Sequence, residues 1–266
     1  KKKMPKIQII ILSGYGEFDY AKEAIKIGVT DYLTKPVTGE QLLEALNKVS
    51  KAISTKNVIP VLAGIKFHLN KKKLTLTASD NDITIETSIP CDNENIILKE
   101  EGSIIIQGKY ILDIVRKLPD EFINIEVVDD LKILIYTENS EFNLNGISEK
   151  EYPSIELIES KNHIELSKTT LKEIVNQTAF ATSLDENKAI LNGINFNIIG
   201  NILECNATDS YRLARKVINL STTAEENLNI VIPSKNLVEF TRILSEGDEK
   251  IEVHIFNNKI LFKNQI

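Results

Sequence analysis

The chain has 266 residues, of which 42% are hydrophobic and 26% are charged, a balance typical of a globular protein large enough for two domains. No apolar run approaches the roughly 20 residues of a membrane-spanning helix, so we expect no membrane partner. Two cysteines that are expected to stay reduced favour a cytoplasmic protein. The net charge of −6 weakens a nucleic-acid hypothesis without excluding it, because net charge describes the average surface and not one face.

The first 40 residues follow a strand-helix-strand pattern. Residues Ile7–Leu12 are almost all apolar, which is typical of a strand buried in a parallel sheet. A helical segment follows and ends at Gly28, and Asp31–Pro36 then predicts a second short strand. This partial α/β pattern differs from everything downstream, so residues 1–40 are predicted to form a separate segment.

Downstream, amphipathic helices and alternating strands predict an α+β module. Its expected elements are a helix from Leu42 to Ile53, a hairpin of strands 73–78 and 83–87, a helix from Lys109 to Leu118, and paired strands 123–127 and 132–136.

The same order of elements then recurs. Residues 61–67 match residues 190–196, which lie 129 positions later, and Asp80 in the hairpin turn matches Asp209. The second copy is expected to contain a helix capped by Ser167 with Leu171, Ile174, Val175, Ala179 and Phe180 on its apolar face, a helix from Ser234 to Leu244, and paired strands 251–255 and 259–262. A period this long indicates a duplicated domain. We therefore predict modules at residues 41–158 and 159–266, each with two helices packed on an antiparallel sheet, placed side by side with their helices on one concave face.

This duplicated region, residues 41–266, resembles the bacterial DNA polymerase III β subunits, the replication sliding clamps. The motifs that carry the resemblance are Lys56–Ile65, Leu191–Ile194, Ala207–Ala214 and Ile232–Lys235. Members of that family have three such modules, and two subunits close head to tail into a ring around duplex DNA. The resemblance implies that the first copy lacks its opening strand, the second lacks its last strand, and the third module is absent. We therefore expect no ring closure by this chain.

In sliding clamps, helices present Lys and Arg to DNA phosphates, a contact that is sequence-independent and salt-sensitive. The candidate positions here are Lys48, Lys51, Lys56, Lys109, Arg116, Lys172, Lys188, Lys235 and Arg242. Lys56 is the strongest candidate, because in the family a basic residue just before the Ile-Pro motif touches DNA. For most of the others a solvated helix face is the alternative. The family's polar and aromatic positions before the Leu-Asn-Gly motif are replaced here by Asp185, Ala189 and Ile190.

The family also binds short linear peptides of its partner proteins in a groove between the second and third modules. Carried over to this chain, the wall from the second module comprises Leu191, Thr208, Ser210, Tyr211, Arg212, Leu213, Pro233, Leu237 and Val238. An apolar cleft with polar groups at its rim suits such a peptide. For Leu191 and Leu213 a core position is the open alternative. The resemblance implies duplex DNA, DNA polymerase III, other clamp-binding proteins and the clamp loader as partners.

Residues 1–40 resemble the C-terminal half of a response-regulator receiver domain, through Ile9–Tyr15, Tyr20–Ala24, Gly28 and Asp31–Pro36. In that family Ser13 and Lys35 would contact an aspartyl phosphate, Tyr32 would be the switch aromatic, and the bond before Pro36 is typically cis. The phosphoacceptor aspartate and the magnesium-binding acidic pair belong to the other half of such a domain. Phosphorelay signalling is therefore the alternative function and is not favoured.

Residues Gly39–Val49 fit either the last receiver helix or the first clamp helix. We therefore expect that two unrelated reading frames were joined at this point, and that the chain is a fragment.

The sequence shows no pattern for catalysis, neither a Gly-rich phosphate loop nor a nucleophile elbow nor a Cys/His pair. We therefore expect an accessory protein without catalytic residues or cofactors. The histidines His68, His163 and His254 lack metal-ligand spacing, so no metal site is expected. Cys91 and Cys205 lie in non-equivalent segments and are expected to stay reduced.

Overall fold

The computed structural model describes residues 10–13, 31–34, 39–53, 59–80, 82–91, 96, 98–118, 122–128, 131–155, 157, 159–160, 163–185, 187–224, 227–256 and 259–264, with the backbone alone in the first two ranges. The chain divides into two compact units, Lys1–Ser154 and Ile155–Ile266. The predicted module boundary after residue 158 and the predicted side-by-side packing stay predictions. Within the described ranges, no helix is long and apolar enough to cross a membrane.

At the start of unit 1, β1 (Ile10–Ser13) and β2 (Asp31–Thr34) form a parallel pair. Parallel neighbours need a crossover connection, so the pairing agrees with the predicted strand-helix-strand order. The helix predicted between them lies outside the described residues. Of the receiver-like residues, Ser13 and Tyr32 lie on these strands, whereas Lys35 and Pro36, with the expected cis bond, lie outside the described residues.

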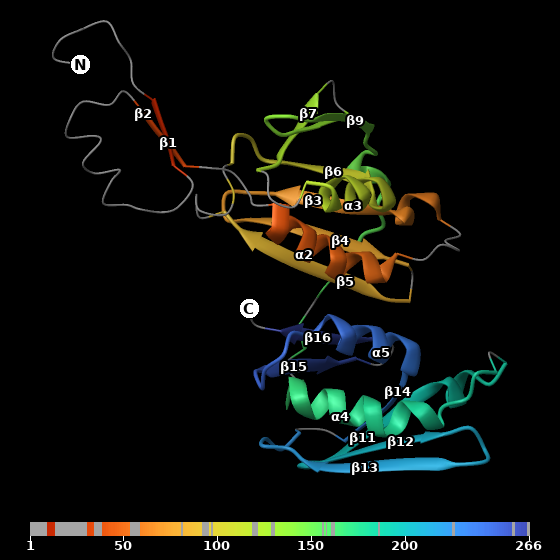
Figure 1. Cartoon of the computed structure of the whole chain (residues 1–266). Helices are drawn as coiled ribbons and strands as arrows, with labels where there is room; N and C mark the ends of the chain where they lie inside the picture. The colour runs from red at the N-terminus through yellow and green to blue at the C-terminus, as the bar shows by residue number, and fades with distance from the viewer. Residues whose placement is uncertain are drawn as a thin grey trace, which may run out of the picture. The chain divides into compact units, whose positions relative to one another are not determined.

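Unit 1 continues with two α-helices and two antiparallel sheets (Figure 1). In chain order its elements are α2 (Gly39–Val49), η1 (Ser50–Ala52), η2 (Pro60–Ala63), β3 (Gly64–Leu69), β4 (Lys73–Ser79), β5 (Thr84–Pro90), β6 (Gly102–Gln107), α3 (Gly108–Arg116), β7 (Asn124–Val128), β8 (Lys132–Tyr136), β9 (Glu141–Asn145) and η3 (Glu149–Glu151). The strands pair in the orders β5-β4-β3-β6 and β7-β8-β9. The predicted hairpin, helices and closing strand pair are all present, with ends shifted by a few residues.

Helix α2 is the element whose sequence fits two families. Its Leu42, Leu46 and Val49 are fully buried, because the helix packs on β5 and on α3. Asn47 on α2 accepts a hydrogen bond from the Arg116 guanidinium on α3 at 3.3 Å. Helix α2 therefore serves as the first helix of the α+β module.

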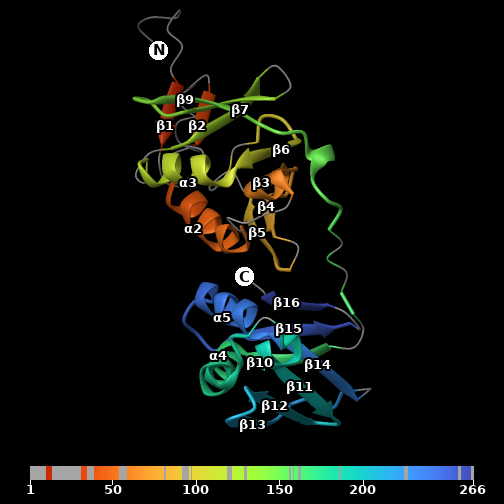
Figure 2. The same ribbon diagram turned by 90° about the vertical axis from the view of Figure 1, so that its right-hand side faces the viewer.

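Unit 2 repeats this arrangement. Its elements are β10 (His163–Ser167), α4 (Lys168–Thr178), η4 (Ala179–Ala181), η5 (Ala189–Asn192), β11 (Gly193–Ile199), β12 (Ile202–Thr208), β13 (Leu213–Asn219), β14 (Leu228–Pro233), α5 (Ser234–Ile243), β15 (Lys250–Ile255) and β16 (Ile260–Asn264). The strands pair in the orders β13-β12-β11-β14 and β10-β15-β16. Figure 2 shows α4 and α5 next to one another on one side of this unit, with the strands on the other.

Helix α4 begins where the sequence predicts. The Ser167 hydroxyl accepts a hydrogen bond from the backbone N–H of Thr170 at 3.1 Å, which satisfies one of the unpaired donors of the first turn. The helix ends earlier than predicted, at Thr178, and the tighter turn η4 follows. This change of pitch turns Phe180 away from the apolar face, so Phe180 is 59% exposed and its predicted place on that face is wrong.

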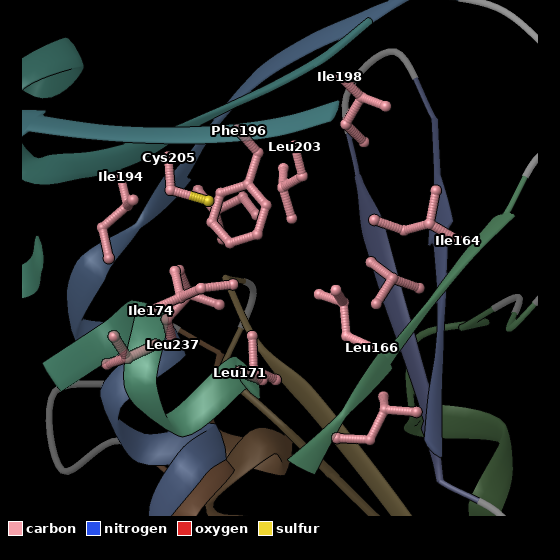
Figure 3. Packing of buried hydrophobic residues seen from close by; sticks show 14 of the residues in the cluster. Ile164, Leu166, Leu171, Ile174, Ile194, Phe196, Ile198, Leu203, Cys205 and Leu237 are labelled. Carbon is pink, nitrogen blue, oxygen red and sulfur yellow. The ribbon is translucent and has the colours of Figure 1, made fainter. Parts of the chain in front are cut away.

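The core of unit 2 lies between its helices and sheets (Figure 3). Phe196 and Cys205 from the four-stranded sheet lie side by side, across the core from Leu171 and Leu237 of the two helices, and all four are fully buried. Burial raises the pKa of the Cys205 thiol to about 12, which keeps it neutral and unreactive. Cys91 and Cys205 are not joined by a disulfide.

The duplication extends to backbone detail. Gly64 and Gly193 each follow a 3-10 turn and begin the first strand of a four-stranded sheet, β3 and β11. A Cβ atom on Gly64 would collide with the Ile105 side chain, and one on Gly193 would collide with that of Val231, the equivalent residue of the neighbouring strand. The matching segments 61–67 and 190–196 thus have the same secondary structure, and close approach of the strands explains the glycine in each.

The small sheets differ at their edges. In unit 2, β10 pairs with β15 immediately before α4, whereas among the described residues of unit 1 no strand pairs with the corresponding edge of β7. Conversely, β9 pairs with β8, and the matching edge of β16 has no partner in the described part of unit 2. These are the two edges at which the sequence predicts that a strand is lacking.

Candidate nucleic-acid and peptide-binding surfaces

On unit 1, two of the side chains predicted to contact DNA, those of Lys48 and Arg116, already bind another side chain of the packed helices α2 and α3. The Lys48 ammonium lies 2.7 Å from the carboxylate of Glu44, one turn earlier on α2. Arg116 uses one of its guanidinium N–H groups to bind Asn47. Glu44 therefore offsets part of the positive charge that Lys48 offers to a phosphate, whereas the neutral Asn47 occupies one donor of Arg116 and leaves its charge unchanged.

On unit 2, acidic residues likewise accompany two of the predicted contacts. The Lys172 ammonium lies 3.5 Å from the carboxylate of Glu246 and donates to the Ser245 carbonyl at 3.3 Å. Arg242 forms an ion pair with Glu239, one turn earlier on α5. Both basic side chains would have to exchange these partners to reach DNA.

Four predicted lysines are exposed and form no ion pair with another residue of the described ranges: Lys51, Lys109, Lys188 and Lys235. Lys109 and Lys235 are equivalent in the duplication, and each is the second residue of its helix, α3 or α5. The strongest candidate, Lys56, lies outside the described residues. The structure thus reduces the predicted set to a smaller group of available charges.

The predicted peptide-binding wall is built around a tight turn between β12 and β13. One carboxylate oxygen of Asp209 accepts hydrogen bonds from the backbone N–H groups of Tyr211 and Arg212, each at 3.0 Å, and the other accepts the Arg212 Nε–H at 2.9 Å. The backbone N–H of Tyr211, supported by these other donors, lowers the pKa of Asp209. Ser210 has a φ of 80°, a left-handed conformation that a serine rarely adopts. The turn is therefore held in one shape despite this strain.

Asp80 has the same role in unit 1, where its carboxylate accepts the backbone N–H groups of Asp82 and Ile83 at 3.1 and 3.0 Å. The two equivalent aspartates therefore stabilise the corresponding turn in each unit.

The turn presents large side chains to solvent. Tyr211 is 95% exposed and Leu213 is 68% exposed. The Arg212 guanidinium lies over the Phe180 ring, 5.6 Å from its centroid, a cation–π contact. Phe180 therefore belongs to this surface, a place that its helical spacing could not indicate, because the spacing does not show that α4 stops at Thr178.

The other residues of the predicted wall differ in exposure. Leu191, Thr208 and Val238 are partly buried, and Ser210 and Pro233 are exposed. Leu237 is only 1% exposed, because the first turn of α5 directs it into the core. Its assignment to the wall is corrected: Leu237 supports this surface from behind and does not face a ligand.

The loop before η5 and the start of η5 hold the positions that correspond to the family's polar and aromatic DNA contacts, namely Asp185, Ala189 and Ile190. The Asn192 side-chain amide donates to the carbonyls of Ser183 at 2.7 Å and Asp185 at 3.1 Å, which ties the loop to η5. Ile190 is exposed, and so is Leu184 in the loop. An apolar side chain is therefore exposed at one of the positions where the family has polar or aromatic ones.

Comparison with known families gives a consistent assignment of the two units. Residues 36–156 match the N-terminal domain of the DNA polymerase III β subunit, and residues 165–265 match its central domain. Residues 1–47 match the response regulator receiver domain. Both families therefore cover residues 36–47, which include most of α2.

Individual relatives agree with these matches. The β sliding clamp of Halalkalibacterium halodurans is 42% identical over 226 residues, which are 83% of this chain and 60% of that protein. The β sliding clamp of Bacillus subtilis is 37% identical over 227 residues, which are 84% of this chain and 60% of that protein. The chain thus spans about 60% of the length of the curated relatives that it matches.

Solved structures share the fold. The DNA polymerase sliding clamp from Bacillus subtilis superposes with a TM-score of 0.83 at 36% identity, over 86% of this chain and 61% of that one. The β subunit from Streptococcus pyogenes superposes with a TM-score of 0.81 at 32% identity, over the same shares of the two chains.

Proposed function

Because the chain belongs to the family of DNA polymerase III β subunits, the bacterial replication sliding clamps, we propose that it works as part of a processivity factor in DNA replication. The helix pairs α2/α3 and α4/α5 contact duplex DNA without sequence preference. The turn at residues 208–213 and its neighbours bind short peptides of replication and repair proteins. The chain acts in the cytoplasm as an accessory subunit and leaves catalysis to the polymerase.

The DNA-binding proposal rests mainly on one observation: an exposed lysine without an acidic partner among the described residues occurs at the same position of the second helix in both units. Lys109 and Lys235 are both exposed, and neither forms an ion pair within the described part of the chain. Each lies in the first turn of its helix, where the partial positive charge of the helix N-terminus adds to that of the side chain. Phosphate contacts need charges that acidic neighbours do not neutralise, and each unit supplies one.

Fluorescence anisotropy with a labelled DNA duplex tests this proposal at several salt concentrations. Lys109→Glu combined with Lys235→Glu should weaken binding and reduce the slope of log affinity against log salt by about 2. The matched control combines Lys71→Glu with Lys72→Glu, which makes the same change of net charge in the exposed turn between β3 and β4. Equal effects of the two pairs, or an affinity independent of salt, would contradict the proposal.

The peptide-binding proposal is supported by the exposed side chains of Tyr211 and Leu213, which come from the hydrogen-bonded turn at Asp209 and lie beside the Arg212–Phe180 contact. Apolar anchors with a charged rim suit a short linear motif. The proposed partners are DNA polymerase III, other clamp-binding proteins and the clamp loader. Residues 1–266 by themselves are expected to bind such peptides and DNA weakly, because in the family a third module completes both the groove and the homodimeric ring. A closed dimer around DNA in sedimentation analysis of these residues would refute that expectation.

Phosphorelay signalling has support only from residues 1–47, and we do not propose it. Incorporation of phosphate from a small phosphodonor into the chain would reopen that alternative.

A further inference from the structure

Three side chains that no proposed clamp function uses converge on the sheet β10-β15-β16. Glu159, Glu252 and His254 each bring one potential ligand atom to within 4.8 Å of the others. Glu252 and His254 are two residues apart on β15 and project from the same face, while the alternate residues of that strand face the core. Glu159 comes from the segment that precedes β10. The cluster thus joins the entry segment of unit 2 to the middle of its small sheet.

His254 is the centre of this cluster and is 2% exposed. Its Nε2 lies 3.2 Å from Glu252 Oε2. Its Nδ1 lies 3.0 Å from the Ser160 carbonyl oxygen and 3.2 Å from the Ser160 backbone nitrogen. The Ser160 carbonyl can therefore accept from a protonated Nδ1, and the Ser160 backbone N–H can donate to an unprotonated one in the other neutral tautomer. When Nδ1 carries the proton, however, the unprotonated Nε2 and the Glu252 carboxylate face each other as two acceptors, an arrangement that a cation between them would stabilise.

One of these tautomers is the form that binds metals. When Nδ1 donates its proton to the Ser160 carbonyl, Nε2 presents its lone pair toward the Glu252 carboxylate. Metal-binding histidines use this arrangement, in which the far ring nitrogen donates to a backbone carbonyl and so fixes the tautomer and the ring orientation.

A cationic group already lies between the two carboxylates. The Lys263 ammonium is 2.8 Å from Glu159 Oε1 and 3.5 Å from Glu252 Oε2. Two carboxylates and a neutral imidazole carry two negative charges, which one ammonium neutralises by half and a divalent ion would neutralise fully. The Lys263 side chain is 38% exposed, so it has a path into solvent.

We propose that Glu159, Glu252 and the Nε2 of His254 bind a divalent transition-metal ion, with zinc as the expected ion, in place of the Lys263 ammonium. One imidazole nitrogen with carboxylate oxygens is a donor set that zinc accepts. Ligand atoms about 2.0–2.2 Å from a tetrahedral zinc ion lie about 3.5 Å apart, so the present cluster has to contract by about 1 Å. The exposed Glu159 side chain can make this movement. The bound ion would then fasten the entry segment of unit 2 to β15.

Zinc titration of the full chain by isothermal calorimetry tests the site, with the thermal midpoint as a second readout. The experiment uses the Cys91→Ser variant throughout, so that this thiol cannot supply the binding. Glu159→Gln removes a ligand at an exposed position without endangering the fold, and should weaken zinc binding by more than about tenfold. Lys263→Met removes the competing positive charge and should strengthen binding by at least about tenfold. His68→Asn, which alters a histidine of unit 1, is the matched control and should leave zinc binding unchanged.

Saturable binding of one zinc ion with these three responses supports the proposal, as does a rise of the thermal midpoint with zinc concentration. The proposal is overturned by an absence of saturable zinc binding, by equal affinity of the parent and Glu159→Gln, or by Lys263→Met that binds no more tightly. Cobalt substitution adds an independent check: an absorption spectrum of tetrahedral nitrogen and oxygen coordination supports the site, and a thiolate charge-transfer band overturns it.

Discussion

Replacing Leu213 with alanine should abolish peptide binding while unit 2 stays folded, and replacing Leu237 should mainly destabilise the unit. The two leucines make a matched pair, because both belong to the peptide-binding wall predicted from sequence. In the structure Leu213 is 68% exposed beside Tyr211, whereas Leu237 is buried beside Phe196 and Leu171.

The expected magnitudes follow from this difference in burial. Fully burying a leucine side chain contributes about 1.5–3 kcal/mol to stability, so the one-third of Leu213 that is buried should contribute about 0.5–1 kcal/mol. Leu237→Ala leaves a cavity and should cost about 2–5 kcal/mol. At about 4 °C per kcal/mol for a domain of this size, the thermal midpoint should fall by about 2–4 °C for Leu213→Ala and by about 8–20 °C for Leu237→Ala. Leu191→Ala, at a partly buried position, should have an effect on stability much smaller than that of Leu237→Ala.

Thermal unfolding followed by circular dichroism measures the stability of each variant. Fluorescence polarisation with a labelled peptide that carries the apolar anchors of a clamp-binding motif measures its affinity, at a temperature where every variant is folded. A Leu213→Ala variant that loses as much stability as Leu237→Ala would place Leu213 in the core. One that keeps the parent's peptide affinity would remove Leu213 from the binding wall. Either result would refute the reasoning.

Three further changes test other parts of the structure. Gly193→Ala should lower the stability of unit 2 by about 1–3 kcal/mol in chemical denaturation, because the added methyl group collides with the neighbouring strand. The control is Gly102→Ala, which should have little effect because no atom lies within 4 Å of the new methyl group. The Arg215 guanidinium holds the pKa of Glu204 at about 2, below its ordinary value of 4.5, so this ion pair stabilises the fold above about pH 4.5 and the contribution is lost as the pH falls toward 2. Glu204→Gln should therefore flatten the pH dependence of the thermal midpoint in that window, and an unchanged pH dependence would disprove the assignment. Ser210→Gly should maintain or raise the thermal midpoint, because glycine adopts the left-handed conformation without strain. Ser210→Val should lower the thermal midpoint, because a β-branched residue is strained in that conformation. A valine variant as stable as the parent would show that the turn is not strained.

Features that depend on local pattern and on repetition could be predicted from the amino-acid sequence. The 129-residue spacing located two equivalent modules before any contact was known, and the glycines at 64 and 193 occupy the same place in both. The cap at Ser167 and the turns at Asp80 and Asp209 were predictable because a side chain and the backbone within three residues of it decide them. Helices α2 to α5 followed from the spacing of their apolar residues.

Tertiary structure decided which of the predicted residues are available and which distant residues meet. Helical spacing assigned Phe180 to the core and family resemblance assigned Leu237 to a ligand, but the end of α4 at Thr178 and the direction of α5 reversed both. The acidic partner of Lys172, Glu246, became visible only in the folded chain, whereas the partners of Lys48 and Arg242 lie one helical turn away and are a matter of local spacing. The cluster of Glu159, Glu252 and His254 joins residues more than 90 positions apart. The spacing of these residues in the sequence does not predict that they lie close together in space. Their proximity results from the strand pairing of β15 and from the path of the segment before β10, and both depend on contacts between distant parts of the chain.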